Sequence, residues 1–173
     1  MHDLYVVRGR LAEVHRFINV PMRWLEQYPA RERRELWVST PEGQEVKLIV
    51  HSRAMPARCG HVVEAIVCEG TLVGLSNITT GAQVNYARVD PPLTWRRVDS
   101  AMIAVSWVCA FFVAVVMGWV LVSGLLAVCV LVGLSGTWLK RLARNARLKM
   151  RVDAALDRLT RLQAPRAQLR LVK

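Results

Sequence analysis

Hydrophobic and polar positions divide the chain into an alternating first half, an uninterrupted apolar segment and a basic end. No residue from Ser100 to Leu139 carries a charge, and a single helix of this length would reach about 60 Å. Because that is roughly twice the hydrocarbon thickness of a bilayer, the segment predicts two membrane-spanning helices joined by a turn around 118–124. The alternative is a buried helical hairpin in a soluble protein, but the remaining residues are too few and too polar to build the core it would need.

Basic residues on both sides of the apolar segment predict its orientation. Arg96 and Arg97 precede it, a basic run follows it, and the predicted turn is uncharged. Since Lys and Arg beside a span stay in the cytoplasm, we expect both ends of the chain on the cytoplasmic side of a bacterial-type inner membrane. The residues expected at lipid headgroups are Arg97, Lys140, Arg141, Arg144 and Arg147.

Most of the positive charge lies after the apolar segment. Residues 140–173 have a net charge of +9, out of +11 for the whole chain. Such a segment favours contact with anionic lipid headgroups. Nucleic acid would use the same charge, but the segment has no aromatic residue to stack on bases, so nucleic acid is not the expected partner.

Alternating apolar and polar residues in the first 90 positions predict a small antiparallel β domain. Turn signals occur at Pro41–Gly43, Glu69–Gly70 and Asn77–Gly81. The expected strands are Tyr5–Val14, Glu35–Ser39, Glu45–His51, Val62–Cys68, Thr71–Leu75 and Gln83–Arg88. Closure removes exposed strand edges, so we expect a barrel that is either OB-like (oligonucleotide/oligosaccharide-binding) or SH3-like.

The predicted domain order combines these segments into a mixed β and α membrane protein. It consists of a cytoplasmic β-barrel-like domain over 1–90, a proline-containing linker over 91–99, the transmembrane helical hairpin over 100–139, and a basic cytoplasmic helix and tail over 140–173. The two prolines of the linker favour a stiff, extended connection.

Two patterns in the helical part predict packing against a partner. An apolar stripe with spacings of four and three predicts a helix that ends at Pro165 and packs on the protein's own barrel or on a second copy. Its members are Leu148, Val152, Ala155, Leu159 and Leu162. In the first span, small residues recur every four positions, at Ala110, Ala114 and Gly118, and small residues let helices approach closely in lipid. Together the two patterns predict a homo-oligomer.

The sequence shows no motif for catalysis. It contains no phosphate-binding loop, dinucleotide-binding fingerprint, nucleophile elbow or zinc-protease motif. His51, Cys59, His61 and Cys68 are residue types that bind metals, but their spacing matches no ligand pattern and predicts packing residues instead. We therefore expect a protein that is not an enzyme and has no cofactor or metal.

Three connections in the β domain combine cationic, aromatic and titratable side chains. They are the insertion before the second strand, the loop Met55–His61 and the turn that starts at Asn77. Connections of this kind often carry binding residues. The candidates for binding a ligand or partner are Trp24, Tyr28, Arg31, Arg33, Arg34, Arg58, His61 and Asn77.

These features predict a membrane-anchored adaptor or sensor. Its cytoplasmic β module would bind a protein or a small anionic ligand within a larger inner-membrane assembly, and its other partners would be anionic lipids and a second copy of the chain. One alternative is an oligomeric effector that permeabilises the bilayer when activated. The other is a membrane-tethered, OB-like module that binds nucleic acid.

Overall fold

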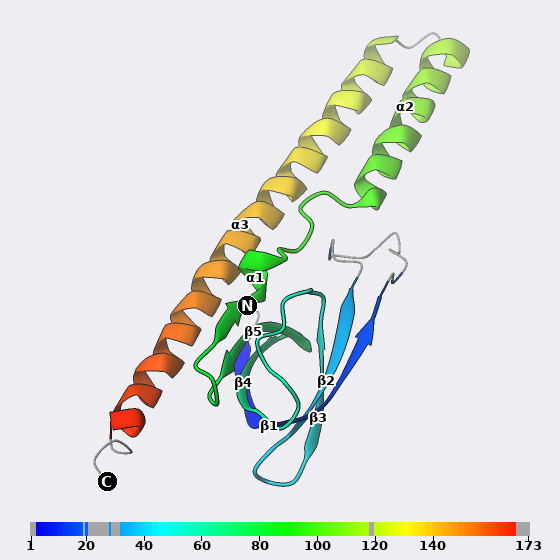
Figure 1. Ribbon diagram of the computed structural model, residues 1–173. Coiled ribbons are helices and arrows are strands. Elements are labelled where there is room, and N and C mark those ends of the chain that lie inside the picture. Colours follow the sequence, from blue (N-terminus) through cyan, green and yellow to red (C-terminus); the bar gives the residue numbers. More distant parts are fainter. Residues whose placement is uncertain (1–2, 19, 21–27, 29–31, 118–119, 169–173) are drawn as a thin grey trace. The chain divides into compact units, whose positions relative to one another are not determined.

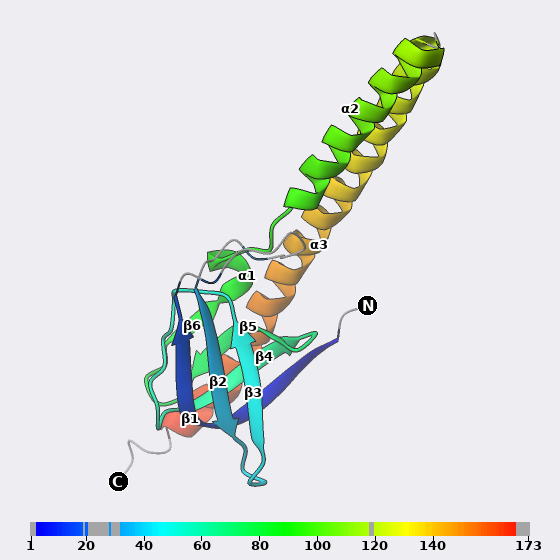
Figure 2. The same ribbon diagram turned by 90° about the vertical axis from the view of Figure 1, so that its right-hand side faces the viewer.

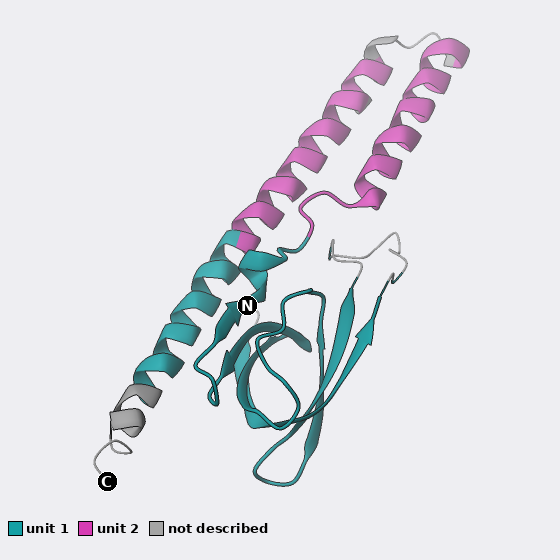
Figure 3. Cartoon of the chain, in the orientation of Figure 1, with its two compact units in different colours: residues 1–21, 28–92, 146–173 teal, residues 22–27, 93–145 magenta. Residues whose placement is uncertain are grey.

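The structure is a computed structural model that describes residues 3–18, 20, 28, 32–117 and 120–168. Its elements in chain order are β1 (Leu4–Phe17), β2 (Arg33–Ser39), β3 (Glu45–Val50), β4 (Val62–Cys68), β5 (Thr71–Asn77), β6 (Gln83–Asn85), α1 (Tyr86–Val89), α2 (Arg97–Met117) and α3 (Val120–Gln168) (Figure 1). They form two compact units (Figure 3). The barrel unit comprises the described residues up to Pro92 and those from Ala146 onward, and the hairpin unit comprises Leu93–Asn145.

Five strands of the barrel unit form a closed β-barrel. The sheet order is β3-β2-β1-β4-β5-β6, and a parallel pairing of Ile49 with Thr71 joins β3 to β5 and closes the ring. β6 pairs with the outer edge of β5. The predicted barrel is therefore present, and the first five predicted strands appear near their expected bounds. The sixth, predicted over Gln83–Arg88, ends at Asn85, because Tyr86–Val89 forms the short helix α1.

β1 belongs to two parts of the barrel, because its first half pairs with β4 and its second half with β2. The change of partner occurs at Arg10, next to a bulge between Leu11 and Glu13. A Cβ atom at Gly9 would lie 2.3 Å from the carbonyl oxygen of Ser39, so a residue without a side chain is required where β1 bends past the end of β2.

The barrel interior is filled by apolar residues that alternate along the strands. Leu36, Val38, Leu48 and Val50 point inward from β2 and β3, whereas their neighbours Trp37 and Ile49 are half-buried. The alternation predicted from the sequence is thus the inside-outside alternation of the barrel wall. Tyr86 of α1, a short helix that the sequence analysis did not predict, packs against this core.

The last part of α3, from Ala146 onward, packs against the outside of the same barrel (Figure 2). Val152 and Leu156 are buried against Ile66, Cys68 and Val73, and these residues form a second apolar cluster. Leu148, Ala155 and Leu159 complete its helical side. The apolar stripe therefore packs on the protein's own barrel, which was one of its two expected partners.

Polar contacts also connect α3 to the barrel. Asn85 donates from Nδ2 to the Lys149 carbonyl oxygen at 3.1 Å and to Oδ1 of Asp153 at 2.6 Å. Arg88 Nη2 lies 2.6 Å from the other carboxylate oxygen of Asp153. These bonds, led by that from Asn85, lower the pKa of Asp153 below its ordinary value. The carboxylate consequently stays charged under neutral conditions.

The hairpin unit contains α2 and the first part of α3, two helices that are long and apolar enough to cross a membrane. Three side chains of these helices are buried, Ala110, Ser123 and Leu134, each no more than 9% exposed. Large apolar side chains on both helices stay exposed, as at Phe111 and Leu125.

Two details of α3 differ from the predictions. The helix begins at Val120, so Ser123 and Gly124 lie inside it and the connection from α2 is shorter than the predicted turn. The helix also continues past Pro165 to Gln168. A proline in the last turns of a helix removes one backbone hydrogen bond close to the end, and the helix continues for three more residues.

Candidate functional site

An arginine-rich rim lies at one end of the barrel, where β1 ends, β2 begins and the chain leaves β3. We use the name arginine rim for Arg16, Arg33, Arg34 and Arg53 together with Glu32. Strand pairing explains the grouping: Arg16 lies opposite Arg34, and Arg34 lies opposite Val50, three residues before Arg53. Antiparallel register therefore brings three distant segments of the sequence to one place.

Glu32 is the centre of the rim and is only 5% exposed. Its Oε1 accepts hydrogen bonds from Arg16 Nε at 2.6 Å and from Arg34 Nη2 at 2.8 Å. Arg16 Nη2 also donates to Oε2 at 3.2 Å, so that this arginine binds both carboxylate oxygens. A bidentate arginine–carboxylate pair is among the stronger hydrogen-bonded arrangements in proteins.

The ionisation of Glu32 follows from these contacts. Hydrogen bonds from Arg16 and then Arg34 lower the pKa of Glu32 to about 2, against the opposing effect of burial. Glu32 in turn raises the pKa of Arg16. A carboxyl group with a pKa this far below neutrality is a weaker base than an ordinary glutamate, and it stays charged beside the two arginines.

The rim carries more positive charge than Glu32 neutralises. Arg34 is already engaged, because it bonds Glu32 and also donates from Nη2 to the Arg53 carbonyl oxygen at 2.7 Å. Arg33 pairs with Glu35 at 3.0 Å and lies over the Phe17 ring, 4.9 Å from its centroid. The Arg53 side chain is 83% exposed, and its Nε lies 4.0 Å from Glu32. Arg53 and the exposed side of Arg16 can therefore approach a further anion.

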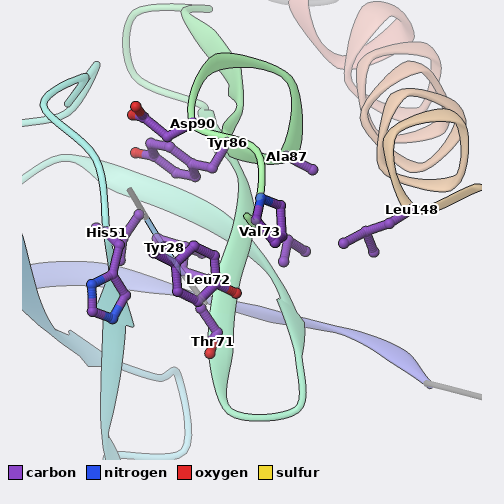
Figure 4. A pocket seen from close by; sticks show the side chains of 11 residues that line it. Tyr28, His51, Thr71, Leu72, Val73, Tyr86, Ala87, Asp90 and Leu148 are labelled. Carbon is purple, nitrogen blue, oxygen red and sulfur yellow. The ribbon is translucent and has the colours of Figure 1, made fainter. Parts of the chain in front are cut away.

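The barrel unit also contains a small pocket (Figure 4). One of its lining residues, Val50, pairs with Arg34 of the rim in the sheet. On one side Tyr28 stacks on His51, with ring centroids 4.7 Å apart and planes within 1° of parallel. Tyr86 and Asp90 lie on the other side, and burial raises the pKa of the Tyr86 hydroxyl. The volume is about 10 Å³, roughly the space of one water molecule, so the pocket cannot enclose a ligand in this form.

A second cluster joins the loop Met55–His61 to the turn that follows β5. Asn77 is fully buried, and its Nδ2 donates to the Pro56 carbonyl oxygen at 2.9 Å and lies 2.9 Å from Nδ1 of His61. Its Oδ1 accepts hydrogen bonds from the backbone N–H groups of Thr79 and Thr80. These contacts give Asn77 a structural role, because no surface of it is left for a ligand.

The predicted binding residues therefore fall into separate groups. Tyr28, Arg33 and Arg34 lie at the arginine rim or in the small pocket, whereas Arg58, His61 and Asn77 belong to the second cluster. Trp24 and Arg31 lie outside the described residues. Sequence reasoning did not select Arg16, Glu32 and Arg53. The sequence feature that could have pointed to this site is Glu32, the single carboxylate in the basic run at 31–34.

The residues predicted to contact headgroups or other helices also have definite places. Arg97, Lys140, Arg144 and Arg147 are exposed. Arg141 is partly buried, pairs with Asp99 at 2.5 Å and donates to the Thr94 carbonyl oxygen, so it connects the two helices of the hairpin unit. Ala110 is buried in that unit, Ala114 is half-buried, Gly118 lies outside the described residues, and Leu162 at the end of the apolar stripe is 70% exposed.

Comparison with known proteins adds no relative. No protein-family model, curated protein or solved structure matches the chain. Within the described ranges, no three His, Cys, Asp or Glu side chains gather in a way that could hold a metal ion. The arginine rim is the candidate site because it gathers four arginines around one buried carboxylate.

Proposed function

We propose that this protein is a membrane-anchored, non-enzymatic adaptor or sensor whose barrel binds an anionic ligand, or an acidic segment of a partner protein, at the arginine rim. The observation that carries the proposal is the excess of arginine around one buried carboxylate. Arg34 and Arg16 are held in place by Glu32, and the exposed Arg53 lies beside them. Arginine positioned in this way suits phosphate or carboxylate groups, because its planar donors match both.

The proposed anchor is the helical hairpin, in a bacterial-type inner membrane with both ends of the chain in the cytoplasm. Exposed large apolar residues support it, because in water such a surface would be costly. The few polar side chains of the helices support it as well. Ser106 and Ser135 donate their hydroxyl groups to carbonyl oxygens four residues earlier, at Met102 and Leu131, so these donors need no water.

The barrel subtype that we propose is OB-like. Its five closed strands and the long first strand shared between two parts of the barrel agree with that fold. OB-like barrels bind many kinds of ligand, so the fold alone does not select one. The choice of an anionic ligand depends on the arginine rim.

Calorimetry on the full chain in nanodiscs of zwitterionic lipid tests the proposal, with pyrophosphate and citrate as anionic probes. We expect binding that Arg53→Gln weakens by about ten-fold or more, the effect of losing one hydrogen bond to a charged group. Arg58→Gln is the matched control, because Arg58 is an exposed arginine of the second cluster. Absence of binding for both probes, or weakening by Arg58→Gln alone, would overturn the proposal.

The oligomeric effector remains a second candidate because of two glycines in α3. A Cβ atom built at Gly133 or Gly136 would meet no atom of the described residues within 4 Å. Open glycine positions on a membrane helix allow a further helix to approach closely. A vesicle-leakage experiment, argued in the Discussion, separates this candidate from the adaptor.

A further inference from the structure

The first half of β1 has an edge that no described strand covers. β4 pairs with one edge of β1 over Leu4–Arg10, whereas β2 pairs with the other edge only from Arg10 onward, because β2 ends at Ser39. No strand among the described residues lies along this second edge at positions 4–9. In Figure 2 this part of β1 runs away from β2 and β3 toward the N-terminus. The closed barrel thus leaves one short strand edge open for pairing.

Hydrogen bonds next to this segment show which backbone groups face the open edge. Leu11 donates its N–H to the His61 carbonyl oxygen at 2.9 Å and accepts from the Gly60 N–H at 2.7 Å, so the Leu11 groups point toward the β4 side. Backbone groups of alternate residues point to opposite edges, and the register between β1 and β4 is regular from Leu4 to Arg10. The N–H and C=O groups that face the open edge therefore belong to Leu4, Val6 and Arg8.

The side chains of this segment favour strand pairing. Residues 4–7 are Leu, Tyr, Val and Val, an uncharged run in which most residue types favour strands. Tyr5 and Val6 are 49% and 48% exposed. Proteins usually protect an open edge with a lysine, a proline or a bulge, and positions 4–7 contain none of these. The following charge, Arg8, lies 3.8 Å from Glu64 of β4. This edge therefore has the properties of an interface.

We propose that the open edge of β1 binds the same edge of a second copy of this chain, as antiparallel strands about a two-fold axis at Val6. In that register Val6 lies opposite Val6 of the second copy, and Leu4 lies opposite Arg8. The residues whose backbone groups face the open edge then meet one another, and their pairs form about six hydrogen bonds. Tyr5 lies opposite Val7, an aromatic and β-branched pair of a kind that stabilises sheets, and no like charges lie opposite each other.

An extended segment of another protein is the alternative occupant of this edge. A second copy fits better, because the two-fold register pairs each open backbone group with another open group. The apolar stripe of α3, the other surface expected to join two copies, is covered by the barrel of its own chain. The paired edges are short compared with a stable interface of about 1,200 Å² or more, so we expect a dimer that forms at high protein concentration.

Disulfide cross-linking of the full chain in detergent tests the proposal, with the four native cysteines changed to serine. Val6→Cys should link two copies under mild oxidation, because directly opposed residues of antiparallel strands have Cα atoms about 5.5 Å apart. Arg8→Cys and Glu13→Cys are the controls, since both positions are exposed but would lie at least about 13 Å from their own counterparts. In membranes of expressing cells, a Val6→Cys product with a mass other than twice that of the chain would give the edge to another protein and overturn the proposal.

Light scattering over a range of protein concentrations, with the native cysteines kept reduced, measures the dimer without a cross-link. Val6→Lys places two like charges at the two-fold axis and should halve the protein mass, whereas Val6→Thr keeps a β-branched side chain and should remain a dimer. Val6→Pro removes an N–H that faces the open edge and should also give a monomer, with urea unfolding as the check that the barrel is intact. An unmodified chain that is monomeric at every concentration, or a dimer that Val6→Lys leaves unchanged, would overturn the proposal.

Discussion

Gly74 of β5 and Val152 of α3 are in direct contact, and a Cβ atom at Gly74 would lie 2.9 Å from Cγ1 of Val152. The same added atom would lie 3.2 Å from Cδ1 of Ile66. The helix therefore approaches the barrel this closely because β5 has no side chain at that position. Close packing between α3 and the barrel thus depends on a single glycine.

Substitution of Gly74 should weaken the docking of α3. We expect Gly74→Ala to destabilise the protein by about 1–3 kcal/mol, because β-branched Val152 cannot move aside without strain. Val152→Ala should cost about 2 kcal/mol through lost burial. In the double variant the smaller side chain makes room for the new methyl group, so its cost should be less than the sum. Urea unfolding of the four proteins measures this coupling, and strictly additive costs would contradict the contact.

The partner of the apolar stripe shows what sequence can and cannot predict. Spacings of four and three were sufficient to predict the helix and its apolar face. They could not distinguish the protein's own barrel from a second copy, because an apolar stripe indicates that this face of the helix is covered but not which surface covers it. Gly74 carried no such signal in the sequence, since its role depends on a helix about 80 residues later.

Acid should destabilise the barrel through Glu32. The pKa of Glu32 is about 2 in the folded protein against an ordinary value of 4.5, so between these values the unfolded chain binds more protons. The free energy of unfolding should therefore fall as the pH decreases from about 4.5 towards 2, with a contribution that approaches about 1.4 kcal/mol per pH unit. Urea unfolding at a series of pH values measures the slope.

Two variants test whether Glu32 is the source of this slope. Glu32→Gln cannot ionise, so its slope in that window should be smaller than in the unmodified protein. Arg16→Gln removes the hydrogen-bond partner that lowers the pKa of Glu32 most. The pKa of Glu32 in the folded protein should therefore rise, and the pH range over which the free energy of unfolding falls should become shorter. An unchanged slope in Glu32→Gln would show that other carboxyl groups cause the acid sensitivity.

The arginine rim was only partly visible in the sequence. Tyr28, Arg33 and Arg34 could be selected because they stand in a segment rich in charge and aromatic rings. Arg16 and Arg53 come from other strands, and only the register of β1, β2 and β3 brings them to Glu32. The positions of the strands could be predicted from the local alternation of apolar and polar residues. To predict a site whose residues come from three strands, the pairing register of those strands must also be known.

Membrane topology should follow the basic flanks of the hairpin. We expect reporter fusions after Arg97 and after Arg161 both to report a cytoplasmic location. Ser123 lies in the turn predicted from the sequence but is buried within α3, whereas Val122 near the start of α3 is exposed and is the better site for a labelled cysteine. With the four native cysteines changed to serine, a cysteine at Val122 should be labelled from outside the cell. A periplasmic signal from either fusion would reject the hairpin topology.

Ion leakage from vesicles separates the adaptor from the oligomeric effector. The described parts of α2 and α3 between Ser100 and Leu139 contain no charged residue, so a pore there would have to gate through an apolar constriction. For an adaptor, reconstituted vesicles should leak only at background level. Gly133→Leu and Gly136→Leu should not change that level, although they fill open positions on α3.

Ala110→Leu is the control, because it enlarges a buried side chain of the hairpin unit and leaves the open glycines unchanged. Leakage by the unmodified protein that Gly133→Leu or Gly136→Leu abolishes would show that helices of several copies meet at these glycines, and it would replace the adaptor with the effector.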